Sequence, residues 1–416
     1  MHERLANACR MVLLAAIAVG AVACGNSAPP IARTSAIKIP AGERSPTVDT
    51  RAPSPPKPRA VPEGDKPLSD IRDLAPGAEC PDPGPSGSAV IAAAGSARIP
   101  LKVGLTLSSI WKANAEDYEH ECLLQIFQID GRQITTTQSC PTGKNHVPLR
   151  LVRRICWTDV MDSYLYITQV AKTYPETLVG ALKFNLSVAS FAALKTRGKV
   201  RHRYLQIDDQ NLAFSEIDVE GTLVSDGPAN FKLIINDKVV EVPTIEANYV
   251  NFRTNDIIRV KVLDDARFPL TLDYYIPSLH RFFITYDKVS FPTANELEQH
   301  LAVDKHTDVY GIYFNFASDE LRSESEPVLN EIANALKAHP EWTLIINGHT
   351  DNIGGDPLNL DLSRRRATAV RKALVDRYKI EDSKLTTNGF GASQPKESND
   401  SDRGRALNRR VELVRP

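Results

Sequence analysis

Half of the proline in this 416-residue chain lies in one stretch, because 14 of the 28 prolines fall between Pro29 and Pro85. Proline removes a backbone N–H donor and fixes φ, so a segment this rich in proline cannot continue a helix or a central strand. The stretch also has almost no aromatic residues and cannot bury enough apolar surface to offset its ordering entropy. We therefore predict a disordered Pro-rich tether over residues 24–88, with the folded domains after it.

The first 23 residues have the organisation of an export signal. Arg4 and Arg10 precede a 13-residue run of apolar and small residues, Met11–Ala23. That run is shorter than the roughly 20 residues of a membrane-spanning helix, and its basic start and small-residue end are typical of a secretory signal peptide. We predict a signal peptide over residues 1–23.

The end of this signal resembles a bacterial lipobox, because Ala21-Val22-Ala23 precedes Cys24. The resemblance implies that Cys24 becomes the lipid-bearing first residue of the mature protein. Gly25, rather than Asp, follows the cysteine, and by similarity to enterobacterial sorting this favours the outer membrane, with the protein facing the periplasm. An ordinary secretory peptide with an incidental cysteine is the alternative.

Four cysteines remain after the signal and the lipidated position: Cys80, Cys122, Cys140 and Cys156. None of them forms a C-x-x-C pair, so a zinc or thioredoxin-like site is not indicated. An even number of cysteines in an oxidising compartment predicts two disulfides, and three connectivities are open. Four buried free thiols are the alternative.

Residues 89–300 are predicted to be β-rich. Several short runs favour β-branched and aromatic residues, and Asp130-Gly131 separates two alternating runs within Leu123–Gln138, which is a hairpin signal. Residues 176–196 fit either a helix or two strands. The pattern predicts a sandwich-like domain or two small β domains. Strands that span a membrane also alternate, but the short strands and the four cysteines favour a disulfide-linked soluble domain.

Residues 304–416 alternate between helical and strand patterns, which predicts an α/β sandwich of about 110 residues. The predicted strands are residues 310–316, 342–347, 385–388 and 410–414. Ser323–Glu326 fits a capping box that opens a helix ending at His339-Pro340. Leu362, Arg366, Val370 and Leu374 recur at four-residue steps and predict a second helix.

Three motifs occur in order in this last region: Gly348-His349-Thr350-Asp351-Asn352-Ile353-Gly354, then Asn359 to Ala367 (N-L-D-L-S-R-R-R-A), then Gly404 to Val411 (G-R-A-L-N-R-R-V). Together they resemble the OmpA-like peptidoglycan-binding domain, over about 110 residues. The resemblance implies the fold of that family for residues 304–416 and a non-covalent peptidoglycan-binding function.

The resemblance also implies the binding residues. Asp351 and Arg366 match the pair that holds diaminopimelate of the wall peptide, and positions that shape the pocket are matched by Thr350, Asn359, Leu362 and Arg409. Diaminopimelate presents an ammonium, which Asp351 can bind, and a carboxylate, which the planar Arg366 guanidinium can bind through two parallel N–H bonds. Ala317 departs from the family, where a polar residue often contacts the ligand.

These features predict a lipid-anchored envelope protein that binds peptidoglycan and tethers the outer membrane to the wall, without enzymatic activity. The alternative is a wall-modifying enzyme, or a protein that binds or senses an envelope partner, with its site in residues 89–300. No cofactor or metal is expected, because His349 has no second His or Cys at ligand spacing. A formal net charge of −1 argues against nucleic acid as a partner.

Overall fold

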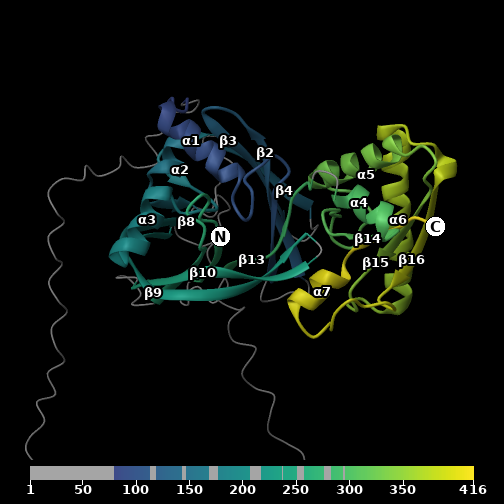
Figure 1. The fold of residues 1–416 in the computed structure, drawn as a ribbon. Helices are drawn as coiled ribbons and strands as arrows, with labels where there is room; N and C mark the ends of the chain where they lie inside the picture. Colours follow the sequence, from purple (N-terminus) through teal and green to yellow (C-terminus); the bar gives the residue numbers. More distant parts are fainter. Residues whose placement is uncertain are drawn as a thin grey trace, which may run out of the picture. The chain divides into compact units, whose positions relative to one another are not determined.

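A computed structural model describes residues 79–416, except 113–118, 143–146, 168–176, 207–216, 237, 251–256, 276–282 and 294–295 (Figure 1). The predicted signal peptide, Cys24 and most of the predicted tether therefore lie outside the described residues. Among the helices that are described, none is both long and apolar enough to cross a membrane.

The β-rich prediction for the middle of the chain is confirmed. The described strands join in one mixed sheet with the order β6-β4-β3-β2-β1-β13-β12-β11-β10-β9-β8-β5-β7. The strands are β1 Thr106–Lys112, β2 Glu119–Ile129, β3 Gln133–Thr142, β4 Val147–Cys156, β5 Leu165–Ile167, β6 Thr177–Leu178, β7 Ala181–Leu182, β8 Lys199–Gln206, β9 Ile217–Ile235, β10 Lys238–Val250, β11 Ile257–Leu263, β12 Thr271–Tyr275 and β13 Phe283–Ser290. A sandwich would have two separate sheets, whereas here hydrogen bonds connect all the strands.

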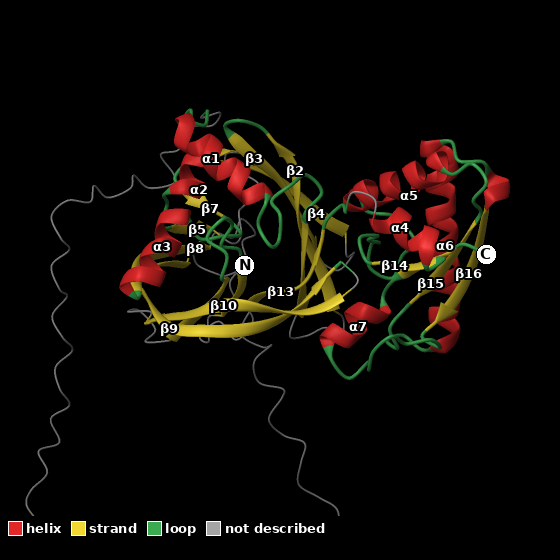
Figure 2. Ribbon diagram, viewed as in Figure 1, coloured by secondary structure: helices red, strands yellow, loops and turns green. Residues whose placement is uncertain are grey.

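This sheet curls strongly (Figure 2). Its two outermost strands, β6 and β7, are consecutive in sequence, so the two edges of the sheet lie close together. β13 also pairs in parallel with β9, at Lys288↔Ile234 and Val289↔Ile235. The β-rich region contains two separate clusters of buried side chains. One cluster contains Trp157, Phe184 and Phe268, and the other contains stacked tyrosines such as Tyr166 and Tyr274.

The predicted hairpin is confirmed: β2 and β3 pair antiparallel, and Asp130 accepts hydrogen bonds in the turn from the backbone N–H groups of Arg132 and Gln133. The ambiguous segment 176–196 contains both kinds of element, the short strands β6 and β7 and the helix α3 Val188–Arg197. Two further helices, α1 Gly84–Gly95 and α2 Trp157–Met161, were not predicted.

The four cysteines form two disulfides, as predicted, and the structure selects one of the three connectivities: Cys80–Cys156 and Cys122–Cys140. Cys80 is buried, and α1 begins at Gly84, so ordered structure starts before the predicted boundary at residue 89. The proline content there does not prevent a helix, because Pro85 lies in the first turn, where a missing N–H costs nothing.

Residues 296–416 form a compact α/β unit with its own core. The sheet order is β14-β17-β15-β16, with β15 and β16 parallel and the other neighbours antiparallel. The elements are α4 Glu296–Val303, β14 His306–Val309, α5 Glu326–Ala338, β15 Leu344–His349, α6 Asp356–Tyr378, β16 Leu385–Gly391, α7 Asp402–Asn408 and β17 Val411–Val414. Helices α5 and α6 lie against the same face of the sheet (Figure 2), and their apolar stripes supply much of a core that includes Leu329, Ile332, Val370 and Leu374.

Two local predictions in this unit are wrong. The first strand is His306–Val309 rather than 310–316, where only Phe314 forms an isolated bridge, to Leu321. The capping box does not form either. The Ser323 hydroxyl donates to Glu324 Oε2 at 3.3 Å and does not cap a helix. Helix α5 begins at Glu326, and the Ser325 hydroxyl before it bonds the backbone N–H and C=O of Tyr313.

Candidate functional site

The candidate site is built where β15 ends and α6 begins. Two glycines with positive φ, Gly354 at 98° and Gly355 at 87°, turn the chain into α6, whose first turn carries a proline. Close packing brings strand and helix together: a Cβ on Gly348 would lie 2.2 Å from the Ser363 carbonyl oxygen. The loop therefore emerges next to the first turns of α6.

Asp351 lies in this loop and is held from two sides. It is 8% exposed, and its Oδ1 accepts a hydrogen bond from the Ile353 N–H at 3.0 Å. Its Oδ2 accepts from Arg409 Nη1 at 2.7 Å, which forms an ion pair with the residue that follows α7. Asn359 fixes the same loop, because its Nδ2 donates to the Asp351 carbonyl at 3.0 Å. Three of the predicted site residues therefore meet.

Arg366 lies on α6 and faces a short turn that spans Tyr313–Arg322. Its Nε donates to the Ser318 carbonyl at 3.0 Å, and its guanidinium lies 4.9 Å from the centre of the Phe314 ring. Burial and the charge of Arg409 lower the Arg366 pKa to about 10, whereas Asp351 acts in the opposite direction. Arg366, Asp351 and Arg409 therefore share one electrostatic environment, although the only direct ion pair among them is Asp351–Arg409.

The two remaining predicted residues lie beside this cluster. Thr350 is 4% exposed, and its backbone N–H donates to the Gly391 carbonyl at 3.0 Å. Its hydroxyl is buried and has no hydrogen-bond partner among the described residues. Leu362 is half-buried on α6, one turn before Arg366. The Thr350 hydroxyl is thus enclosed by protein and is not open to solvent.

Two of the Arg366 contacts were not predicted. Phe314 lies in the segment 310–316, which was expected to be a plain strand, and Ser318 lies two residues after it. Ala317, the departure from the family pattern, has a φ of 47° within this turn. Only the phenylalanines of the sequence F-N-F-A-S could have signalled a stacking surface.

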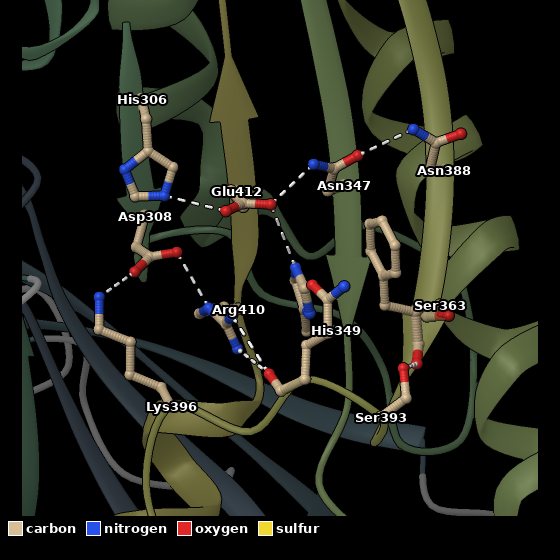
Figure 3. Close-up of polar contacts among 12 residues, drawn as sticks. His306, Asp308, Asn347, His349, Ser363, Asn388, Ser393, Lys396, Arg410 and Glu412 are labelled. Carbon is tan, nitrogen blue, oxygen red and sulfur yellow. Dashed lines mark hydrogen bonds and ion pairs between the residues drawn. The ribbon is translucent and has the colours of Figure 1, made fainter. Parts of the chain in front are cut away.

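His349, the histidine of the first motif, belongs to a different polar network on the sheet (Figure 3). Its ring stacks on Phe390 at 5.3 Å between centres, and its Nε2 lies 3.5 Å from Glu412 Oε2. Burial would raise the Glu412 pKa. The interaction with His349 and the hydrogen bond from Asn347 Nδ2 outweigh burial and hold this pKa at about 2. The side chain therefore supports the sheet next to the loop and does not face Asp351.

The same network contains three side chains with metal-ligand atoms within 4.8 Å of one another: His306, Asp308 and Glu412. Protein donors already occupy these carboxylates. Asp308 accepts from Arg410 Nε at 2.9 Å and also pairs with Lys396, and Glu412 Oε1 lies 2.9 Å from His306 Nε2 (Figure 3). With two cations on Asp308, the cluster is a network of internal ion pairs and not an open cation site.

Comparison with known proteins matches residues 313–409 to the OmpA family. Outer membrane porin F of Pseudomonas aeruginosa is 38% identical over 101 residues, which is 24% of this chain and 29% of the porin. The peptidoglycan-binding protein ArfA of Mycobacterium tuberculosis is 45% identical over 87 residues, or 21% of this chain and 26% of ArfA. This chain therefore covers less than a third of either relative.

Among solved structures, the peptidoglycan-associated lipoprotein of Burkholderia pseudomallei is 32% identical, with 25% of this chain and 88% of that chain covered and a TM-score of 0.24.

Proposed function

Because residues 313–409 form an OmpA-like domain, we propose that this chain binds peptidoglycan without covalent chemistry and tethers the outer membrane to the wall through a lipid on Cys24. The observation that carries the proposal is the grouping of Asp351, Arg366 and Arg409 next to one loop. A carboxylate beside a guanidinium is complementary to a zwitterionic amino acid. Diaminopimelate in the wall peptide is such a ligand.

Asp351 can bind the ammonium of this ligand without losing its internal partner. Each carboxylate oxygen has two lone pairs, and Arg409 and Ile353 each use one of the four acceptor sites. These two hydrogen bonds, one from the Ile353 backbone and one from the Arg409 side chain, hold the carboxylate in a fixed orientation. A fixed carboxylate lowers the entropic cost of binding the ligand. Arg409 thus positions Asp351 and prevents it from being a buried, unpaired charge before the ligand arrives.

Arg366 can bind the ligand carboxylate through its terminal nitrogens. Its Nε is already bonded to Ser318, and the Phe314 ring supports the plane of the guanidinium. Nη1 and Nη2 have no hydrogen-bond partner within the described part of the chain and can form the bidentate pair that carboxylates favour. Lysine would provide a charge but not this two-pronged geometry.

Sedimentation with purified sacculi tests the proposal. We expect Arg366→Ala and Asp351→Asn to weaken binding roughly tenfold to a hundredfold, since a hydrogen bond to a charged group contributes about 1.5–3 kcal/mol. Arg364→Ala is the matched control, because Arg364 is an exposed arginine two residues earlier on the same helix. If the double variant Asp351→Asn/Arg366→Ala still pelleted like the wild type, the pocket assignment would be wrong.

The remaining parts of the proposal concern the anchor and the absence of chemistry. The lipobox-like sequence ending at Cys24 supports an outer-membrane anchor facing the periplasm, and the mass of the mature N-terminal peptide checks it. We also propose that no bond of the wall is made or broken. Release of soluble fragments from sacculi by the purified chain would contradict this and favour a wall-modifying enzyme in the β-rich region.

A further inference from the structure

The turn Tyr313–Arg322 has contacts on two sides. Within the turn, the Arg322 N–H donates to the Tyr313 carbonyl at 2.9 Å and the Asn315 N–H to the Glu320 carbonyl at 3.0 Å. On one side, its Phe314 ring and Ser318 carbonyl hold the Arg366 guanidinium. The turn therefore determines where the cation of the proposed site lies.

On its other side, the turn is attached to the β-rich region through Arg322, which is 6% exposed. Arg322 Nη1 donates to the Glu121 carbonyl of β2 at 2.9 Å. Its Nη2 donates to both the carbonyl and the hydroxyl of Ser139 on β3, at 2.7 and 2.6 Å. A buried guanidinium that makes three hydrogen bonds in a planar fork can take only one orientation. The hairpin β2–β3 thus fixes the position of the turn.

Neighbouring contacts reinforce the attachment. Gln125 Nε2 donates to the Glu324 carbonyl at 2.9 Å, and the Tyr313 hydroxyl lies 2.7 Å from the Ser290 hydroxyl. Lys288 Nζ stands 4.7 Å from the centre of the Tyr313 ring. Most of these groups are buried, so water does not compete effectively with the hydrogen bonds between the two regions.

Glu121 adds a charge to the same place. Its carboxylate accepts from Ser108 Oγ at 2.6 Å and pairs with Lys288 Nζ at 2.8 Å. Burial alone would raise the Glu121 pKa, but Lys288 and Arg409 outweigh burial and hold it at about 2. The Glu121 charge also opposes the lowering of the Arg366 pKa. A carboxylate of the β-rich region thus belongs to the electrostatic environment of the site.

We propose that the β-rich region is a positioning platform for the wall-binding site, with Ser139 and Arg322 as positioning residues that act on Arg366 through the turn Tyr313–Arg322. This inference rests on the proposed function. It means that the β-rich region controls the affinity of the C-terminal domain for the wall peptide. The coupling passes from Ser139 to Arg322 through hydrogen bonds, along the backbone of the turn to Ser318, and from the Ser318 carbonyl to Arg366.

The experiment measures the affinity of the full chain, by calorimetry, for a soluble stem peptide that contains meso-diaminopimelate. Ser139→Ala removes one acceptor of Arg322 and alters no residue of the C-terminal domain. Coupling of this kind predicts an affinity lower by about two- to thirtyfold, and Arg322→Lys should have an effect in the same direction. Thr137→Val is the matched control, because Thr137 lies two residues earlier on β3 and its buried hydroxyl has no partner among the described residues; its affinity should equal that of the wild type.

A second readout separates positioning from general stability. In the Arg366→Ala background, Ser139→Ala should have no further effect on affinity, since residues that act through one another are not additive. The NMR signal of the Arg366 Nε–H should also shift in Ser139→Ala but not in Thr137→Val. If Ser139→Ala and Arg322→Lys bind the peptide like the wild type, the positioning role of the β-rich region is wrong and the proposed function is unaffected. If Arg366→Ala also binds like the wild type, the proposed function fails together with it.

Discussion

At the scale of single residues, Asp159 is a buried carboxyl outside the proposed site. It lies in α2, is 7% exposed, and its Oδ2 accepts a hydrogen bond from the Gly180 N–H at 2.9 Å. Burial raises its pKa to about 7, although the Gly180 bond acts in the opposite direction. The folded chain therefore holds a proton at Asp159 where an unfolded chain, with a carboxyl pKa of about 3.9, has lost it.

This difference predicts a stability that falls as pH rises. A raised folded-state pKa contributes stability that is present at low pH and lost between about pH 4 and pH 7, by an amount on the order of a few kcal/mol. Asp159→Asn should remove this part of the pH dependence, so that its unfolding free energy declines less than that of the wild type from pH 5 to pH 8. Urea unfolding at these pH values measures it. Asp162→Asn, which changes an exposed carboxylate nearby, is the control, and equal pH slopes in all three proteins would contradict the assignment.

The site residues differ in how far the sequence alone could predict them. Asp351, Asn359 and Arg409 were predicted from motifs, and the structure brings them into contact; their roles in binding remain predictions. Ser318 holds Arg366 through a backbone carbonyl, which any residue type offers, so no sequence pattern marks it. Glu121 comes from a strand far away in sequence, and only the tertiary structure brings it near Arg366.

At the scale of elements, the approach of α6 to the sheet depends on glycine at Gly348. An added Cβ would lie 2.2 Å from the Ser363 carbonyl oxygen, which belongs to the helix backbone and cannot move aside as a flexible side chain can. We expect Gly348→Ala to destabilise the chain by about 1–3 kcal/mol, the usual cost of overpacking. It should also weaken peptidoglycan binding, because α6 carries Arg366.

Chemical denaturation and sedimentation with sacculi measure the two effects. Gly131→Ala is the control, since a Cβ there meets nothing within 4 Å. A Gly348→Ala variant with the stability and binding of the Gly131→Ala protein would show that α6 tolerates a larger separation from β15.

The elements that the sequence predicted well have a clear local signal. Helix α5 buries one apolar stripe, whereas the buried side of α6 also includes the polar residues Asn359 and Ser363. The hairpin β2–β3 contains Asp-Gly, a sequence typical of hairpin turns. The strand predicted over 310–316 failed for a tertiary reason. Its residues alternate like a strand, but Ser325 binds the backbone of Tyr313 and Ala317 adopts a positive φ, so the segment forms a turn. Helix α7 is only Asp402–Asn408, too short for a periodic signal.

At the scale of the whole molecule, the sequence predicted a β-rich region followed by an α/β domain, but it could not predict how the strands are ordered. Neighbours such as β1 and β13 are separated by most of the region. Such pairing depends on contacts between distant segments, which local patterns do not encode. The C-terminal core also begins earlier in the chain than the predicted residue 304, because Leu301 of α4 is buried in it.

The two disulfides act on the whole chain to different extents. Cys80–Cys156 closes a loop with a sequence separation of 76, and it fixes the segment before α1 to the end of β4. Cys122–Cys140 spans a separation of only 18 and joins two strands that already pair as a hairpin. Since a disulfide restricts the unfolded chain more when its loop is longer, the expected stabilisation is about 4.5 kcal/mol for the first and about 3 kcal/mol for the second.

Paired substitutions test this order. Cys80→Ala/Cys156→Ala should lower the guanidinium unfolding midpoint more than Cys122→Ala/Cys140→Ala, when both proteins are unfolded without reductant. The buried position of Cys80 and Cys156 adds a packing loss in the same direction. The shorter disulfide should matter more for binding than for stability, because Cys122 and Cys140 adjoin Glu121 and Ser139, which hold Arg322. A larger loss of stability from the shorter disulfide would mean that the hairpin β2–β3, and not the closure of the long loop, limits the stability of the chain.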